Sequence, residues 1–168
     1  AVSGQSIVIS SGPTLTLAND SDNVPSRYVV MGSTDNVIYK LRLTANNTED
    51  VRITDVIFRD TITGNTAGLS SFSDLSLYDG DTVVVGPITL ILGSDNQTTG
   101  TVTFRLGSAS SLLIPKNSSK TVTLKGSLAT FISGGAASNS GHTFGINAIG
   151  DVTAYGKDSS TSATISGT

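Results

Sequence analysis

The chain has little of what most enzymes use. Its 168 residues include no cysteine and no tryptophan, and histidine, glutamate and methionine occur once each, as His142, Glu49 and Met31. Acid–base and nucleophilic catalysis depend on clusters of such side chains, and no Gly-x-Ser-x-Gly sequence positions a nucleophile. Glu49 and the neighbouring Asp50 would point to opposite faces of a strand, unlike the paired carboxylates of glycosidases. We therefore expect a protein that is not an enzyme and has no cofactor.

Charge is also scarce. Charged residues make up 14% of the chain, against about 25% in an average domain. The net charge is −3 and the ten basic residues are scattered singly, which argues against nucleic acid, because phosphate binding needs clustered Lys and Arg. No stretch approaches the roughly 18 apolar residues of a membrane span. A small residue at position 1 fits a chain after signal-peptide removal, so we expect an extracellular or cell-surface protein.

The chain is instead rich in hydroxyl side chains, with Ser and Thr at 48 positions, and in apolar residues that alternate with polar ones. The alternation predicts short strands throughout the chain and no window has a convincing helical stripe. About ten strands at this spacing are typical of a sandwich or a barrel, and we predict an all-β, antiparallel β-sandwich, of which the immunoglobulin-like and jelly-roll folds are examples. Beyond the N-terminal patches described below, the predicted strands cover residues 37–45, 51–58, 74–78, 82–85, 87–92, 101–106, 112–114, 121–125, 142–149, 151–155 and 163–165.

Two local features refine this prediction. The apolar face changes phase between Ile53 and Val56, and because a one-residue slip would turn the core face to solvent, we predict a β-bulge near Asp55. Residues 79–81 (DGD) stand between two strand patterns and predict a tight hairpin.

The N-terminal 20 residues differ from the rest. They carry two alternating patches, Ile7 with Ile9 and Leu15 with Leu17, followed by a polar break at residues 19–23. We divide the chain into an N-terminal extension, residues 1–20, and a single sandwich domain, residues 21–168. Residues 5–18 can equally form the first strands of their own domain, and the sequence leaves both possibilities open.

The middle of the chain resembles a known class of module. Residues 41–47 (LRLTANN), 49–54 (EDVRIT), 75–80 (LSLYDG) and 113–124 (LIPKNSSKTVTL) occur in an order that is similar to the immunoglobulin-like sandwich modules of prokaryotic surface, S-layer and filament-forming proteins. The resemblance covers about half of the chain and consists of strand and turn patterns. It implies an exported structural module, sometimes a subunit of an extracellular fibre.

Subunits that each contain a single sandwich can form a fibre when every subunit donates a strand to its neighbour. Edge strands accept further strands, and donor-strand pilins assemble in this way. We therefore expect a homopolymer in which the N-terminal extension is the donor strand and Ile7, Ile9, Leu15 and Leu17 are the anchors. The alternative is a secreted or cell-surface binding or adhesion module for a carbohydrate or protein ligand, although aromatic residues for stacking on sugars are scarce.

Other residues suggest modification or metal binding. Asn-x-Ser/Thr sequons at Asn19, Asn46, Asn96 and Asn117 are candidate glycosylation sites in an exported chain. Residues 79–81 and 20–23 present closely spaced oxygens that could hold Ca²⁺, but turn formation and a solvated linker explain them as well, and we assign no metal site. His142 has no second His or Cys with which to bind a metal, so we expect a surface or hydrogen-bonding residue. Lys40 and Lys125 fall on outward faces, which argues against an internal isopeptide bond.

Overall fold

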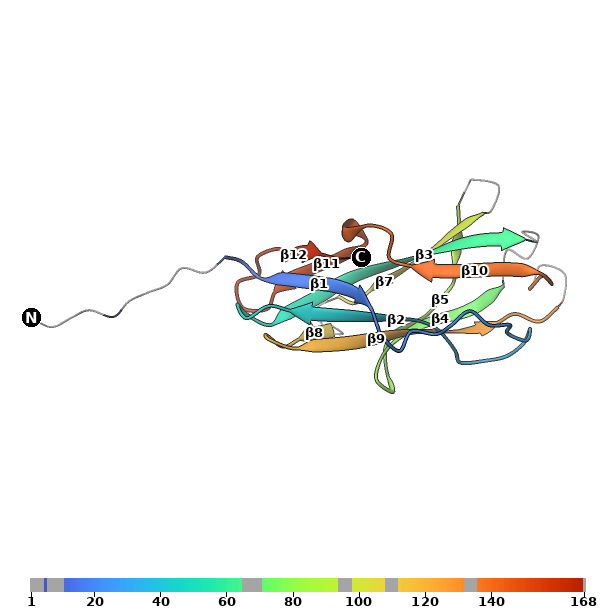
Figure 1. The fold of residues 1–168 in the computed structure, drawn as a ribbon, viewed down its shortest axis with the longest axis horizontal. Coiled ribbons are helices and arrows are strands. Elements are labelled where there is room, and N and C mark those ends of the chain that lie inside the picture. Colours follow the sequence, from blue (N-terminus) through green and yellow to red (C-terminus); the bar gives the residue numbers. More distant parts are fainter. Residues whose placement is uncertain are drawn as a thin grey trace, which may run out of the picture.

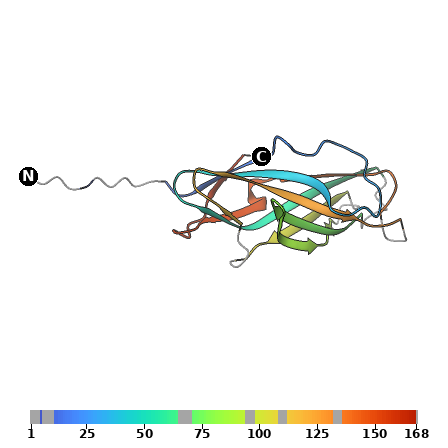
Figure 2. The same cartoon turned by 90° about the horizontal axis from the view of Figure 1, so that it is seen from below.

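The computed structural model describes residues 5, 11–64, 71–93, 98–107, 112–131 and 136–167. In this part of the chain two β-sheets lie face to face and enclose one hydrophobic core (Figure 2). Within each sheet the described strand pairs are antiparallel, except that β1 runs parallel to β12. The predicted all-β sandwich is confirmed.

The first sheet has the strand order β12-β1-β2-β9-β4-β5. Its long central strands, β2 and β9, alternate Leu, Val and Ile with Thr, Lys and Arg, so that one face enters the core. The bounds are β1 (Thr14–Asn19), β2 (Asn36–Ala45), β4 (Phe72–Asp79), β5 (Thr82–Ile88), β9 (Ser119–Leu128) and β12 (Thr164–Ser166).

The second sheet is built around one long strand, β3 (Val51–Gly64). The second half of β3 pairs with β10 (Ser140–Gly145) and β7 (Thr99–Arg105), and β7 pairs with β6 (Ile91–Leu92). The first half pairs with β11 (Val152–Gly156) and β8 (Leu112–Ile114). A short 3-10 turn (Ile149–Asp151) connects β10 to β11. Figure 1 shows β10 and β11 in line along one side of β3.

The predicted bulge lies in β3. Thr153 of β11 faces Asp55 and the next residue, Ala154, faces Ile53, so Thr54 is the extra residue. The bulge lets Val51 and Ile53 on one side of it, and Val56 and Phe58 on the other, all reach the core with 0% exposure. Phe58 then packs edge-to-face against Tyr39 and Phe104, at centroid distances of 5.8 and 5.9 Å.

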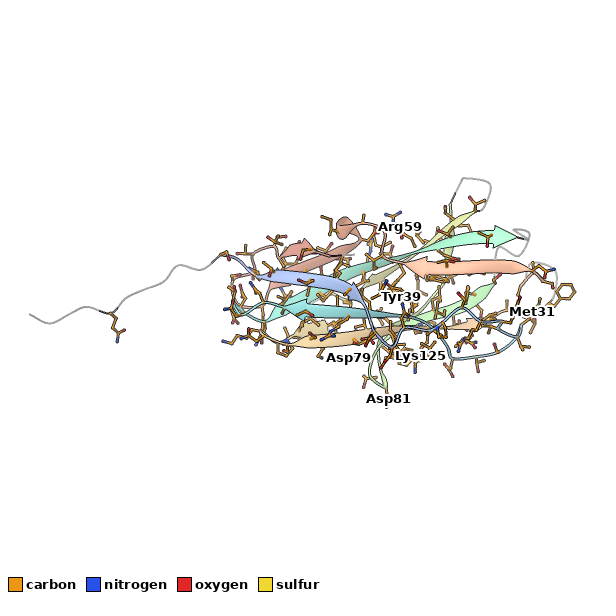
Figure 3. All side chains as sticks on the ribbon, in the orientation of Figure 1. Met31, Tyr39, Arg59, Asp79, Asp81 and Lys125 are labelled. Carbon is orange, nitrogen blue, oxygen red and sulfur yellow. The ribbon has the colours of Figure 1, made fainter. Side chains whose placement is uncertain are left out.

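The predicted hairpin at residues 79–81 is also confirmed. Asp79 pairs with Thr82, so Gly80 and Asp81 form the two-residue loop between β4 and β5. Gly80 has φ +60°, and a hairpin turn of this kind needs a positive φ at its first central position, which glycine adopts without steric cost. The tip projects from the side of the sandwich, where Figure 3 labels Asp79 and Asp81.

The division of the chain at residue 20 needs correction. β1 forms hydrogen-bonded ladders with β2 on one side and β12 on the other, and Leu15 and Leu17 are 0% and 2% exposed in the chain's own core. Alternation predicts that a strand is buried but does not say in which subunit, and here β1 completes its own sheet. The sandwich therefore takes in residues 14–19. No helix in the described ranges has the length and apolar character to cross a membrane.

Candidate functional site

Two of the four predicted anchors are thus placed. Leu15 and Leu17 belong to the core of their own subunit, so they are not the residues that would enter a neighbour. Ile7 and Ile9 lie outside the described residues. For the predicted donor strand, the part of the sequence that precedes β1 remains.

The described sequons lie on the surface. Asn19 ends β1 and accepts a hydrogen bond from the hydroxyl of Tyr39. Asn117 is exposed, and its amide donates to the carbonyl of Asn46 at 2.9 Å, so these two sequons meet at one end of the sandwich. Within its own sequon, Asn46 Nδ2 donates to Thr48 Oγ1 at 2.9 Å. Asn96 lies outside the described residues.

The acidic loops use their oxygens within the protein. Asp79 binds Lys120 Nζ at 2.5 Å. Asp20 accepts the Thr121 hydroxyl at 2.5 Å and the Asp22 amide at 2.9 Å, and these hydrogen bonds lower the pKa of its carboxyl. Across the described ranges, no three His, Cys, Asp or Glu side chains come together in a way that could hold a metal ion.

His142 is a hydrogen-bonding residue. Its Nδ1 lies 2.6 Å from Asp60 Oδ2, and its ring packs edge-to-face on Phe72 with centroids 5.1 Å apart. Asp60 is 1% exposed. Asp60 Oδ1 and His142 Nε2 are buried without a hydrogen-bond partner. No sequence pattern predicts this pair, because the two residues are 82 positions apart and meet only through the pairing of β10 with β3.

Short connections link the two sheets at several places. Residues 89–90 carry the chain from β5 to β6, and the buried Leu90 fills the corner between the sheets. Residues 115–118 carry it from β8 to β9. Residues 157–163 carry it from β11 to β12, with Ala163 donating its amide to Ala154 at 2.9 Å. The connections at 89–90 and 157–163 join strands that lie at the edges of the two sheets, whereas β9 lies inside the first sheet.

Among the described residues, no such connection lies along one side of the sandwich. Here the edge strand of the second sheet, β10, faces residues 36–40 of β2, beside which β1 has already ended at Asn19. We call these two backbone stretches the open edge. The segment between β1 and β2 adds no strand there; it runs along the outside of the first sheet instead (Figures 1 and 2). An edge of this kind presents backbone groups that another strand can bind.

The two halves of the open edge differ in how their backbone groups are paired. On β2, the Lys40 amide donates to Asn23 Oδ1 at 3.0 Å, the Lys40 carbonyl accepts the Asp20 amide at 3.1 Å, and Arg27 donates to the Val37 carbonyl at 2.9 Å. On β10, no described strand pairs with the side that faces away from β3. The outer edge of β10 is therefore the more accessible of the two.

A cavity opens between the sheets where β1 ends. Its volume is about 160 Å³, comparable with the roughly 150 Å³ apolar cavity that accommodates a benzene molecule. Tyr39 extends into this region between β1, β2 and β10 (Figure 3), and burial raises the pKa of its hydroxyl. The lining combines apolar side chains with polar groups, and it consists of Leu17, Ala18, Asn19, Tyr39, Leu41, Phe144, Gly145 and Ile146.

Apolar side chains are also exposed at the far end of the molecule. Tyr28 is fully exposed, and Val30 and Phe131 are 78% and 75% exposed. Their two segments lie side by side, since Gly32 donates its amide to the Ala129 carbonyl at 3.1 Å. We call Tyr28, Val30 and Phe131 the end patch. It lies at the end of the sandwich that Met31 marks in Figure 3, opposite the end at which β1 begins.

A buried carboxylate fixes the connection after β10. Asp151 is 2% exposed and receives two hydrogen bonds from Arg59 Nε and one from Nη2, at 2.7–3.0 Å. It also accepts the amides of Asn147 and Ala148 at 3.2 and 3.0 Å. Burial alone would raise its pKa, but Arg59 and the two amides outweigh this and hold the pKa below the ordinary Asp value. Asp151 thus orients the backbone that leaves the open edge.

No protein-family model matches the sequence, and no curated protein matches it either. The resemblance to surface and filament modules therefore remains a prediction. The open edge, the cavity and the end patch are the features of the structure that bear on its function.

Proposed function

We propose that the protein is a non-enzymatic structural subunit of an extracellular filament or surface layer. In this proposal each subunit donates the segment before β1, with Ile7 and Ile9 as anchors, to a neighbouring copy. One observation carries the proposal. β1, which begins at Thr14, already lies between β2 and β12 in its own sheet. The alternating Ile7 and Ile9 precede this strand and are not needed to complete the sheet. The open edge beside β10, in contrast, lacks a strand in the described part of the chain.

Such donation produces a long polymer. The donor and the acceptor are different surfaces of the same chain, and a contact between unlike surfaces repeats without closing unless a ring forms. Added strands bind through main-chain hydrogen bonds, and the alternate side chains fill pockets between the sheets. A 168-residue chain with a single sandwich can therefore extend a filament by repeating one contact.

The surface chemistry of the proposed subunit is consistent with export. Asn19, Asn46 and Asn117 lie at strand ends or in turns, where a glycosylating enzyme can approach them. The proposal therefore includes glycans attached at these positions and a place at the cell surface or outside the cell. Mass spectrometry of the protein isolated from its source measures the glycans directly.

A second function is favoured by the end patch. Tyr28 and Phe131 are exposed rings at one end of the sandwich, and exposed aromatic side chains are a common means of binding a carbohydrate or a protein. A binding or adhesion module should select particular ligands on a glycan array as a monomer. A structural subunit should bind none of them selectively.

Negative-stain electron microscopy of the full chain at high concentration tests the proposed function. We expect uniform filaments from the unchanged protein and loss of filaments from the double variant Ile7→Asp/Ile9→Asp, because charged side chains cannot enter an apolar site. The matched control is Val8→Asp/Ser10→Asp, which places the same two charges on the opposite face of the segment and should still assemble. Monomers alone from the unchanged protein, across salt and calcium conditions, would contradict the proposal.

A further inference from the structure

The proposed function leaves open which edge accepts the donor. We infer that the outer edge of β10 receives residues 6–10 of a second copy of this chain, with Ile7 and Ile9 turned inward toward the cavity. This inference rests on the proposed function and specifies its acceptor. The backbone of β10, the direction of the strands, the cavity and the end patch support it.

The backbone of β10 has the required polarity. In β3, Ile62 donates its amide to Thr98 on the side away from β10, so the opposite residue, His142, is not hydrogen-bonded to it. In an antiparallel ladder such residues alternate with hydrogen-bonded ones. The amides and carbonyls of His142 and Phe144 therefore point away from β3, and an added strand could bind both.

The direction of the strands requires a head-to-tail arrangement. β1 runs from the end of the sandwich at which the N-terminal segment enters toward the end patch, whereas β10 runs the opposite way (Figure 1). A neighbour placed beyond the end patch in the same orientation would send its N-terminal segment back over β10. That segment would run parallel to β1 and therefore antiparallel to β10, which is the pairing that β10 already makes with β3.

Side-chain alternation then fixes the register to within two-residue steps. Opposite residues in a sheet point to the same face, and the side chains of His142 and Phe144 point inward, with Phe144 lining the cavity. Inward-facing Ile7 and Ile9 must therefore lie opposite inward-facing residues of β10. Placing Ile7 opposite Phe144 and Ile9 opposite His142 puts one apolar side chain beside the cavity and the other beside the Phe72 ring.

The length of the linker brings the neighbours into contact. The Pro13 side chain is buried in its own sandwich, and the three steps from residue 10 to residue 13 reach about 11 Å at most when extended. A donor that ends its pairing at residue 10 must therefore hold its own sandwich against the end of the neighbour. The end patch of Tyr28, Val30 and Phe131 lies at that end, and this contact would cover it.

Disulfide cross-linking tests the acceptor directly. The chain has no cysteine, so every cross-link can be assigned to introduced residues. In the proposed register Val8 lies opposite Thr143, whose side chain is exposed, in a pair without backbone hydrogen bonds. Such pairs have Cα atoms about 4.5 Å apart, within the range of about 4.4–6.8 Å that a disulfide spans. We expect Val8→Cys/Thr143→Cys filaments to yield a ladder of covalent oligomers on a non-reducing gel.

Matched variants separate the possible outcomes. Ser6→Cys or Ser10→Cys combined with Thr143→Cys shifts the tested register by two residues, and a stronger ladder from either would keep β10 as acceptor and correct the register. Val8→Cys combined with Val83→Cys probes another edge, on β5, where Val83 is 50% exposed, and should give no ladder. Filaments that cross-link through Val83, or that form without any cross-link to Thr143, would overturn this inference but not the proposed function. Absence of filaments from the unchanged chain would overturn both.

Discussion

The two halves of the sandwich differ in whether a strand covers the edge of the second sheet. In the half built on the start of β3, β11 turns back through residues 157–163, crosses to the other sheet as β12 and pairs with β1. In the half built on the end of β3, β10 and residues 36–40 of β2 face each other without a strand between them. On the side of β3 where β10 and β11 lie, the described chain therefore closes the edge beside β11 and leaves the edge beside β10 without a strand.

The largest expected effect tests whether the closed half holds its own N-terminal strand. Leu15→Ala removes a side chain with 0% exposure and should lower the free energy of unfolding by about 2–5 kcal/mol, because a cavity replaces well-packed atoms. Urea unfolding of the monomer measures the loss. Ile7→Ala is the control, with an expected change within about 0.5 kcal/mol. A small effect at Leu15 would mean that β1 does not stabilise its own subunit.

The next effect concerns the connection between β10 and β11, whose backbone is held by Asp151. Asp151→Asn keeps the shape but removes the charge that pairs with Arg59, so we expect a loss of about 1–3 kcal/mol at neutral pH. Because the folded pKa lies below the unfolded value of about 3.9, the charge stabilises the fold above that value and this stability is lost as the pH falls through the folded pKa.

The pH dependence provides the matching control. Below the folded pKa of Asp151 both proteins carry a neutral side chain at this position, so their stabilities should converge. Chemical unfolding at a series of pH values between 7 and the acid limit of folding measures this. A difference that stays constant as the pH falls would show that Asp151 acts through its shape rather than its charge.

A smaller effect is expected at the boundary between the halves. Tyr39→Phe removes the hydroxyl that donates to Asn19 but keeps the ring that packs on Phe58. Because Asn19 is exposed, the loss should be near the lower limit for a hydrogen bond, about 0.5 kcal/mol. Tyr39→Ala is the comparison, since it also removes the ring and should cost several times more. Equal losses would mean that the hydroxyl, not the ring, is what Tyr39 contributes.

The smallest effect concerns the exchange rates of backbone amides at the open edge, and it involves no change in stability. In the monomer, the amides of His142 and Phe144 should exchange with solvent faster than the amide of Thr143, which faces β3. In filaments the first two should become protected, because a donated strand would bind them. Hydrogen exchange followed by NMR of the monomer and by mass spectrometry of the filament measures both states. Equal protection of all three amides in the monomer would contradict an open edge.

Local patterns predicted much of the fold but not the site. The bulge at Thr54 and the turn at Gly80 followed from a phase change and a turn sequence, since both depend on neighbouring residues. The open edge depends on which strands pair across the whole chain, and alternation within β10 does not reveal which sides are covered. The same limitation explains Leu15 and Leu17, which were correctly predicted to be buried but were assigned to a neighbouring subunit.

The parallel pairing of β1 with β12 has a mechanical consequence. In a filament under tension, the pull on the donated segment would pass directly into β1 at Thr14. Hydrogen bonds join β1 to β2 and β12 on both sides, and they lie across the direction of that pull. They would therefore share the load in shear instead of being peeled apart one at a time, and the closed half would act as the anchor of each link.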